Sequence, residues 1–524
     1  MSSTSSDGHD IARSVGDIER DLATEARDLS DSIKHDYSTS AHGIVPLNRR
    51  RPLWHFAALW LTFSSGFSYL FLGFVIHDGG NSLLSTVWIV LLGCAFYFVY
   101  VMAAAYLGSR TGQTHTLLTR SVFGISGSAL VSLFIFIGAV GWAGFQANLT
   151  AQIWDGLFGW GHVELLGIIL GVVMVFNNIL GFTGISVFAR YIATPILLIW
   201  VIYLVIKGLV SDYSSLTGTP KATAGGLTLW PAVGVVMGYL AYGNEPDIWR
   251  YGKPRFWWPT FAFVFSFIAG LLLCTAGGWM MAALAHTSSF GPVIHFTTHY
   301  SFFGLFWLAW ILATVTQVAI NDSNYYEAVN AVQNIMGGWR HWRRIYTCAL
   351  AAAGAALAAW LVIYVIPNGF IKMATFLSIT AVSATVIMVI DHYLLPRMFR
   401  VSRSLFKVPA WSETAWINWP GVIALLVAVV WGGYASGLWP GENTTTYLWL
   451  PSVESWAIAG VGYVVAVAIM RAVTPNFKAR SKTLLGFSKP AREAELRPGE
   501  IDDLATREYE TGEGRPVVGE AQPI

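Results

Sequence analysis

Apolar residues gather in runs of about 20 along most of the chain, and a short polar connection follows each run. A helix of about 20 apolar residues crosses a hydrocarbon core of about 30 Å, so each run predicts one membrane-spanning helix. We therefore predict an all-α polytopic membrane protein with twelve transmembrane helices. The expected spans lie near residues 54–76, 81–107, 128–152, 163–184, 188–209, 228–245, 257–284, 302–333, 345–366, 369–391, 418–438 and 452–472.

Positive charges in the connections support this number of spans. Cytoplasmic connections of membrane proteins carry an excess of Lys and Arg. If the N-terminus is cytoplasmic, the outside connections hold only Lys207, Lys221 and Lys372. The inside connections hold Arg110, Arg120, Arg190, Arg250, Lys253, Arg255, Arg340, Arg343, Arg344, Arg397, Arg400, Arg403 and Lys407. We expect a multi-pass protein of the cell membrane with both termini in the cytoplasm.

The composition agrees with this class. Of 524 residues, 55% are hydrophobic and 12% charged, and the mean hydropathy is +0.54, outside the range of soluble globular proteins. The net charge of +2 gives no reason to expect a nucleic-acid partner. Residues 1–50 and 476–524 are polar, so we expect disordered cytoplasmic tails around a transporter domain at 51–475. We expect a monomer in the lipid bilayer.

Two predicted spans are poor helices at their centres. The first contains small and hydroxyl residues between Phe63 and Gly73, and the sixth contains several glycines between Gly234 and Gly243, followed by Pro246. Irregular backbone at membrane depth occurs where it lines a cavity or is buried in protein. Such breaks five spans apart are typical of two five-helix inverted repeats with a substrate site at the breaks. The alternative is that these glycines only let helices pack closely.

The boundaries of these repeats follow from the predicted spans. Repeat one covers about 52–212, repeat two about 226–398, and two accessory spans cover about 418–473.

The third and eighth spans carry polar side chains that suit a binding site. Trp142 and Gln146 are four residues apart, so a helix places them on one face, which suits a flat polar molecule. They could instead pack against a neighbouring helix. The eighth span contains hydroxyl, amide and acidic residues through Glu327, and ionisable residues within a membrane mark function by default. Alternatively this span ends near Ile320, which would leave the acids at the interface.

Five short motifs follow one another along the predicted spans. They are Arg120-Ser-Val-Phe-Gly124, Trp142-x-x-x-Gln146, Pro246-Asp247-Ile-Trp-Arg250-Tyr251, Asn321-Asp-Ser-Asn324-Tyr325-Tyr326 and Asp391-His-Tyr-Leu394. Together they resemble the motifs of the nucleobase:cation symporter-1 family, and above all its purine and cytosine permease branch. One departure is Ile320, where many relatives of that family carry Thr.

The resemblance implies a LeuT-type fold and a specific function. It implies five-plus-five inverted repeats with two accessory helices and alternating access around a central site. The expected function is import of a nucleobase or related heterocycle (cytosine-like, purine-like, uracil-like, allantoin-like or thiamine-like) by symport with Na⁺ or H⁺. No cofactor or enzymatic activity is expected, and no metal other than Na⁺.

The resemblance also implies two groups of site residues. The substrate-binding residues would be Trp142, Gln146, Tyr239, Tyr242, Asn321, Asp322 and Gly66. The cation-binding residues would be Phe63, Ser64, Gly66, Thr314 and Thr316.

Other functions remain alternatives at this point. An amino-acid or other small-solute symporter of the same fold would need free helix N-termini to meet a carboxylate. A membrane-embedded enzyme would need converging catalytic or metal-binding residues, which the sequence does not offer. A receptor or channel is a further alternative.

Overall fold

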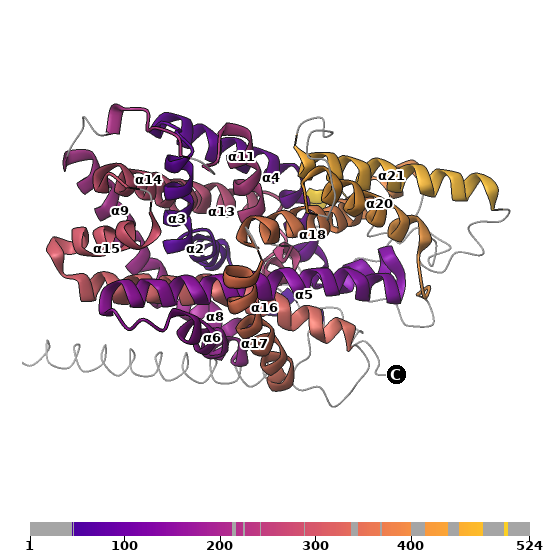
Figure 1. Ribbon diagram of the computed structural model, residues 1–524. Coiled ribbons are helices and arrows are strands. Elements are labelled where there is room, and N and C mark those ends of the chain that lie inside the picture. Colours follow the sequence, from indigo (N-terminus) through magenta and orange to yellow (C-terminus); the bar gives the residue numbers. More distant parts are fainter. Residues whose placement is uncertain are drawn as a thin grey trace, which may run out of the picture.

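The computed structural model describes residues 44–45, 47–211, 216–223, 226–241, 243–287, 289–336, 344–366, 369–399, 414–438, 450–474, 497–500 and 503. Helices are the only extended regular elements in these ranges, and they lie against one another in one bundle (Figure 1). The two predicted tails lie mostly outside the described residues. Within the expected N-terminal tail, the Val45 amide donates to the Gly112 carbonyl at 2.9 Å, which joins this segment to the bundle.

Each predicted span overlaps a helix or a series of consecutive helices. The first is α2 (Leu53–Phe63) with α3 (Phe67–Asp78), which meet at a bend of 49°. The others are α4 (Leu83–Thr111); α5 (His115–Phe158); α6 (Val163–Val173) with α7 (Phe176–Ile179); α8 (Gly181–Phe188) with η2 (Ala189–Ala193) and α9 (Thr194–Ser211); α11 (Leu229–Tyr239) with α12 (Glu245–Trp249); α13 (Trp258–Ser266) with η3 (Phe267–Leu272) and α14 (Leu273–Ala285); α16 (Phe306–Ile335); α17 (Arg344–Trp360) with η5 (Leu361–Val365); α18 (Gly369–Tyr393); α20 (Trp419–Ala435); and α21 (Pro451–Val473).

Seven of the described helices are long and apolar enough to cross a membrane, or eight when the bent α2–α3 pair counts as one span. The segments α6–α7, α11 and α20 are apolar but shorter. Helix α16 is long enough, with 30 residues, but carries many polar side chains, and those from Thr316 to Gln333 are nearly all buried in the protein. A polar helix is stable at membrane depth when its polar side chains face protein. The chain is a multi-pass membrane protein.

Some helix boundaries differ from those expected. Helix α5 begins at His115, and Gly124 interrupts it with φ of 79°, so the predicted third span is only part of a longer element. A short helix, α15 (Phe290–Tyr300), lies between the seventh and eighth spans, where a connection was expected. Helix α16 continues without a break through Ile320 to Ile335, so the helix itself does not end there.

Helices α5 and α16 form the longest helix contact of the bundle. Polar bonds join them along their length: Arg120 Nε donates to Asn334 Oδ1 at 2.7 Å, and Trp154 Nε1 donates to Thr314 Oγ1 at 2.9 Å. Glycines on α5 allow neighbouring helices to pack closely against it. A Cβ on Gly144 would lie 2.4 Å from a backbone atom of α17, so only glycine allows this approach. These contacts fix the face of α5 that carries Trp142 and Gln146.

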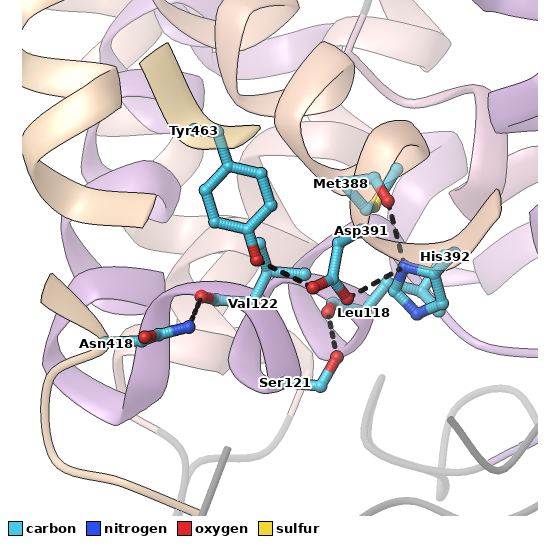
Figure 2. A network of polar contacts seen from close by, with 8 residues as sticks. All are labelled: Leu118, Ser121, Val122, Met388, Asp391, His392, Asn418 and Tyr463. Carbon is cyan, nitrogen blue, oxygen red and sulfur yellow. Dashed lines mark hydrogen bonds and ion pairs between the residues drawn. The ribbon is translucent and has the colours of Figure 1, made fainter. Parts of the chain in front are cut away.

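Buried polar contacts join the accessory helices to the core (Figure 2). Tyr463 of α21 donates its hydroxyl to Asp391 Oδ1 of α18 at 2.7 Å, and His392 Nδ1 lies 3.7 Å from the other carboxylate oxygen. Asn418, at the start of α20, donates from its side chain to the Val122 carbonyl of α5. This polar cluster around Asp391 holds α20 and α21 against α5 and α18.

Candidate functional site

The break between α2 and α3 has a backbone that only glycine adopts without strain. Gly66 has φ of 117°, and a Cβ there would lie 2.6 Å from Ile320 Cδ1 of α16. Polar groups at the break form hydrogen bonds with nearby residues. Ser64 Oγ donates to the Trp60 carbonyl at 2.6 Å, and the Ser68 amide donates to Gln317 Oε1 at 3.3 Å. The break is therefore stable at membrane depth because neighbouring groups bind its backbone.

The sixth span breaks between α11 and α12. Helix α11 ends at Tyr239, Gly243 has φ of 71°, and α12 starts at Glu245 with Pro246 in its first turn. Pro246 lacks an N–H and cannot continue the hydrogen bonding of a preceding helix. Helix α12 also lies close to α4, since a Cβ on Gly108 would be 2.5 Å from Pro246 Cα. Both sequence-predicted breaks are thus present.

A small cavity lies where these breaks meet α5, α16 and α18. Its volume is about 20 Å³, which is space for about one water molecule. The residues around it are Tyr69, Trp142, Gln146, Tyr239, Ala241, Ile320, Asn324, Glu327 and Leu377. A ring-sized ligand requires a larger pocket, so these walls must move apart to admit one.

Aromatic rings form one side of the cavity. The Trp142 and Tyr239 ring centroids are 4.9 Å apart, and Tyr69 lies 5.3 Å from Tyr239. Phe370 lies behind them, 5.5 Å from Tyr239. The Tyr239 hydroxyl donates to the Ser68 carbonyl at 3.1 Å, which fixes this ring against the first-span break. These rings touch one another at angles of 51° to 66°, so they must move apart before an aromatic heterocycle can stack on their faces.

Amide groups form the opposite side. Gln317 Nε2 donates to Gln146 Oε1 at 2.7 Å, and this bond leaves the Gln146 amino group as a donor toward the cavity. Asn324 Nδ2 donates to Asn321 Oδ1 at 3.0 Å, which leaves the Asn324 oxygen as an acceptor on the cavity side. The cavity therefore presents a donor and an acceptor beside the aromatic faces.

The predicted substrate-binding residues do not all line this cavity. Trp142, Gln146 and Tyr239 do, and Gly66 lies next to it, against Ile320. Asn321 lies behind Asn324, with its amino group donating to the Ala143 carbonyl at 3.1 Å. Asp322 faces α7, where Asn177 Nδ2 donates to its carboxylate at 3.0 Å. Tyr242 lies outside the described residues.

The predicted cation-binding residues are similarly divided. Ser64 and Thr316 are buried beside the first-span break, and Thr316 Cβ lies 3.4 Å from the position of a Cβ on Gly66. The Phe63 carbonyl accepts a bond from the Tyr69 hydroxyl at 3.0 Å. Thr314 lies on another face of α16, where its hydroxyl donates to the Trp310 carbonyl at 2.8 Å. Phe63, Ser64 and Thr316 therefore all lie at the break, although the Ser64 hydroxyl faces the Trp60 and Ser266 carbonyls, and Thr314 lies apart.

Sequence reasoning missed several residues of the cavity. Ile320, Asn324 and Glu327 line it from α16 at spacings of four and three residues, and Gln317, which binds Gln146 beside the cavity, precedes them on the same helix face. Counting one helix face from Gln317 instead of Asn321 would have identified these residues. Tyr69 and Leu377 carry no comparable signal, because each is one of many apolar or aromatic residues in its span.

Comparisons with known proteins agree with this geometry. The chain is 25% identical to the cytosine permease of Escherichia coli K12 over 356 residues, which cover 67% of this chain and 78% of that protein. No protein-family model matches the chain.

Solved structures show the same fold. Mhp1, a nucleobase-cation-symport-1 family transporter in a closed conformation with bromovinylhydantoin bound, superposes with a TM-score of 0.66, at 16% identity, over 88% of this chain and 98% of that one. The inward-facing conformation of Mhp1 gives a TM-score of 0.61 at 18% identity, over 83% of this chain and 95% of that one. The LeuT-type fold that the family resemblance implies is therefore confirmed.

Proposed function

We propose that this protein is a secondary active transporter of the nucleobase-cation-symport-1 type, which moves a flat heterocyclic base together with a cation by alternating access. The observation that carries the proposal is the cavity between Trp142, Tyr239 and Gln146 at the meeting point of two broken spans. The similarity to cytosine permease and to Mhp1 supports it. Transport by this route requires binding and a change of conformation, without covalent chemistry.

The cavity chemistry favours an amino-substituted base such as cytosine. Trp142 and Tyr239 would stack on the ring faces, as aromatic side chains do with planar ligands. The Gln146 amino group would donate to a ring nitrogen or carbonyl, and the Asn324 oxygen would accept from an amino group. Asn321 would act by holding the Asn324 amide in this orientation.

An amino-acid symporter of the same fold is less well supported. Such a carrier binds a carboxylate with free N–H groups at a helix start. At the start of α3, the Gly66 amide already donates to Cys274 Sγ at 3.4 Å and the Ser68 amide to Gln317 at 3.3 Å. These donors face protein groups, and the remaining cavity chemistry is aromatic and amide.

The coupling cation is proposed to bind or act near the two breaks. The hydroxyls of Ser64 and Thr316, with the Phe63 carbonyl and the Gly66 backbone, would supply oxygen ligands if the ion is Na⁺. Helix α16 would have to rotate about its axis for Thr314 to reach the same point. Whichever ion is used, its coupling with substrate is reciprocal, and about 1 to 3 kcal/mol of coupling corresponds to roughly 5- to 150-fold in affinity.

The proposed orientation places the arginine-rich end in the cytoplasm. Buried arginines of different connections bind backbone there: Arg50 donates to the Ser109 carbonyl and Arg344 Nε to the Asn178 carbonyl. The positive-inside rule then assigns both termini to the cytoplasm.

Counterflow in proteoliposomes tests the function directly. Vesicles that hold the purified full chain and internal unlabelled cytosine should take up external labelled cytosine. Competition should come from other bases of a panel that contains uracil, adenine, guanine, allantoin and thiamine, and not from free amino acids. Saturable exchange would also exclude a channel. Absence of exchange with every base, or competition by amino acids alone, would contradict the proposal.

A further inference from the structure

Glu327 is a buried carboxyl group in the wall of the cavity. Its side chain is 4% exposed, and its Oε1 atom is buried without a hydrogen-bond partner among the described residues. It lies close to the sixth-span break, because a Cβ on Gly243 would be 2.9 Å from that same oxygen. A carboxyl group without donor or counter-ion in such a place is far more stable as a neutral acid than as an ion.

The ionisable groups around Glu327 include two further acids. Glu245 and Asp247 of α12 interact electrostatically with it, and Tyr100 of α4 interacts with both Glu327 and Glu245. From the other elements around the cavity, α3 and α11 contribute the hydroxyls of Tyr69 and Tyr239, while α5 and α18 contribute the neutral side chains of Trp142, Gln146 and Leu377.

The three acids differ in how well their charges are compensated. Asp247 accepts bonds from the His115 amide at 3.0 Å and Asn330 Nδ2 at 2.7 Å, and it interacts with the Arg250 guanidinium. Glu245 is fully buried, and the Tyr97 hydroxyl donates to one of its oxygens at 2.8 Å while the other has no partner. Asp247 is therefore better compensated than either glutamate, each of which has an oxygen without a partner among the described residues.

These groups extend from the cavity toward one end of the bundle. Glu327 lines the cavity, Glu245 lies at the start of α12, and α12 leads to Arg250, which belongs to the connections rich in positive charge. The Tyr100 hydroxyl is buried without a hydrogen-bond partner among the described residues and interacts with both glutamates. The second glutamate and the tyrosine are therefore electrostatic neighbours of Glu327 that favour its neutral form, since no hydrogen bond joins the three groups among the described residues.

We propose that Glu327 carries the coupling proton of the transport cycle. This inference rests on the proposed function. When the cavity opens outward, the Glu327 carboxylate takes one proton from the external solution. After the cavity opens inward and the base leaves, Glu327 releases that proton to the water that enters the cavity, so one proton crosses with each base.

Protonation also links the proton to the base. A neutral carboxyl group has one O–H donor and one carbonyl acceptor side by side. The ring nitrogen and amino group of cytosine provide the matching acceptor and donor. Ionised Glu327 lacks the donor and would repel the lone pair of that ring nitrogen. Binding of the base therefore favours protonated Glu327, and protonation favours binding of the base, as linkage requires.

The test compares two transport modes of Glu327→Gln in proteoliposomes. Glutamine keeps the size of the neutral acid and cannot release a proton. In sodium-free buffer, the wild-type chain should accumulate labelled cytosine when the outside is acidic, and a protonophore should abolish this accumulation. Glu327→Gln should lose pH-driven accumulation, and its counterflow, at whatever KM the glutamine gives, should no longer depend on pH.

Glu454→Gln is the matched control. Glu454 lies on accessory helix α21, where it accepts a bond from Trp431 Nε1 at 2.9 Å, away from the cavity. This variant should keep wild-type accumulation. If Glu327→Gln fails to fold, Glu327→Asp retains a carboxyl group and should still accumulate cytosine along a pH gradient, with an altered pH profile.

The outcomes separate this inference from the proposed function. Wild-type accumulation that follows a sodium gradient and ignores pH would overturn the proton inference alone, as would normal pH-driven accumulation by Glu327→Gln or a wild-type pH profile in Glu327→Asp. A wild-type chain without counterflow of any base would instead contradict the proposed function.

Discussion

Two buried carboxyl groups in this protein have opposite surroundings. Asp391 of α18 accepts a bond from Tyr463 at 2.7 Å and lies beside His392, within the polar cluster that joins the accessory helices to the core (Figure 2). Glu327 of α16 has a buried oxygen without a partner among the described residues and faces a cavity. Buried polar groups are normally satisfied, so the unsatisfied one indicates function and the satisfied one indicates stability.

This contrast predicts that changes near the cavity alter transport, whereas changes in the polar cluster around Asp391 alter stability. The variants below test that separation.

Gly66→Ala should have the largest effect. The new Cβ would lie 2.6 Å from Ile320 Cδ1, on backbone with φ of 117° that alanine rarely adopts. We expect uptake to fall to background, because the first-span break can no longer form beside the cavity. Gly234→Ala is the matched control, since a Cβ there would be 3.9 Å from the nearest atom, Leu450 Cδ2. Equal uptake by both variants would contradict a role for this break.

Gln146→Ala should come next. It removes the donor that faces the cavity and the acceptor that holds Gln317. A lost hydrogen bond and an unsatisfied partner cost about 1 to 3 kcal/mol, so KM for cytosine should rise by roughly 5- to 150-fold. Gln152→Ala, on the same helix but bonded to Asn148 Oδ1 outside the cavity, should leave KM unchanged. A similar KM in both variants would remove Gln146 from the site.

Tyr239→Phe should have a smaller effect on the same quantity. It keeps the aromatic face and removes only the bond from the hydroxyl to the Ser68 carbonyl. A net hydrogen bond contributes about 0.5 to 1.5 kcal/mol, so affinity for cytosine should fall by roughly 2- to 10-fold. Concentration-dependent counterflow measures this change. No change in affinity would mean that the ring is held by packing alone.

Tyr463→Phe makes the same chemical change in the other region. It removes one donor to Asp391, and hydrogen bonds to charged groups contribute about 1.5 to 3 kcal/mol. Thermal unfolding in detergent should therefore occur at a lower temperature, while KM for cytosine stays at the wild-type value. A changed KM with unchanged unfolding would reverse the assignment of the two regions.

Much of the fold could be predicted from the sequence because membrane spans have a strong signal. Apolar length located the helices, and the glycines and Pro246 located both breaks. The early start of α5 at His115 could not be predicted, because the helical segment before Gly124 is short and a kink at this non-helical residue separates it from the rest of α5. Helix α15 was missed because its 11 residues are too few for a span.

The site could be predicted only in part. Trp142 and Gln146 were identified by their spacing on α5, and they do lie together at the cavity. On α16 the densest polar stretch led to the prediction of Asp322 as a site residue. Its position on the helix places it on the face toward Asn177 of α7 instead. Which face of a polar helix meets a cavity depends on its neighbours, and one sequence does not contain that information.

If the cavity at the two breaks is the substrate site, its residues determine the affinity for the base. Equilibrium binding tests this most directly. Labelled cytosine is bound to purified wild-type, Gln146→Ala and Tyr463→Phe proteins below the unfolding temperature of each. We predict that Gln146→Ala loses affinity and that Tyr463→Phe binds as tightly as the wild type. Wild-type affinity in Gln146→Ala would contradict the claim and place the substrate elsewhere in the bundle.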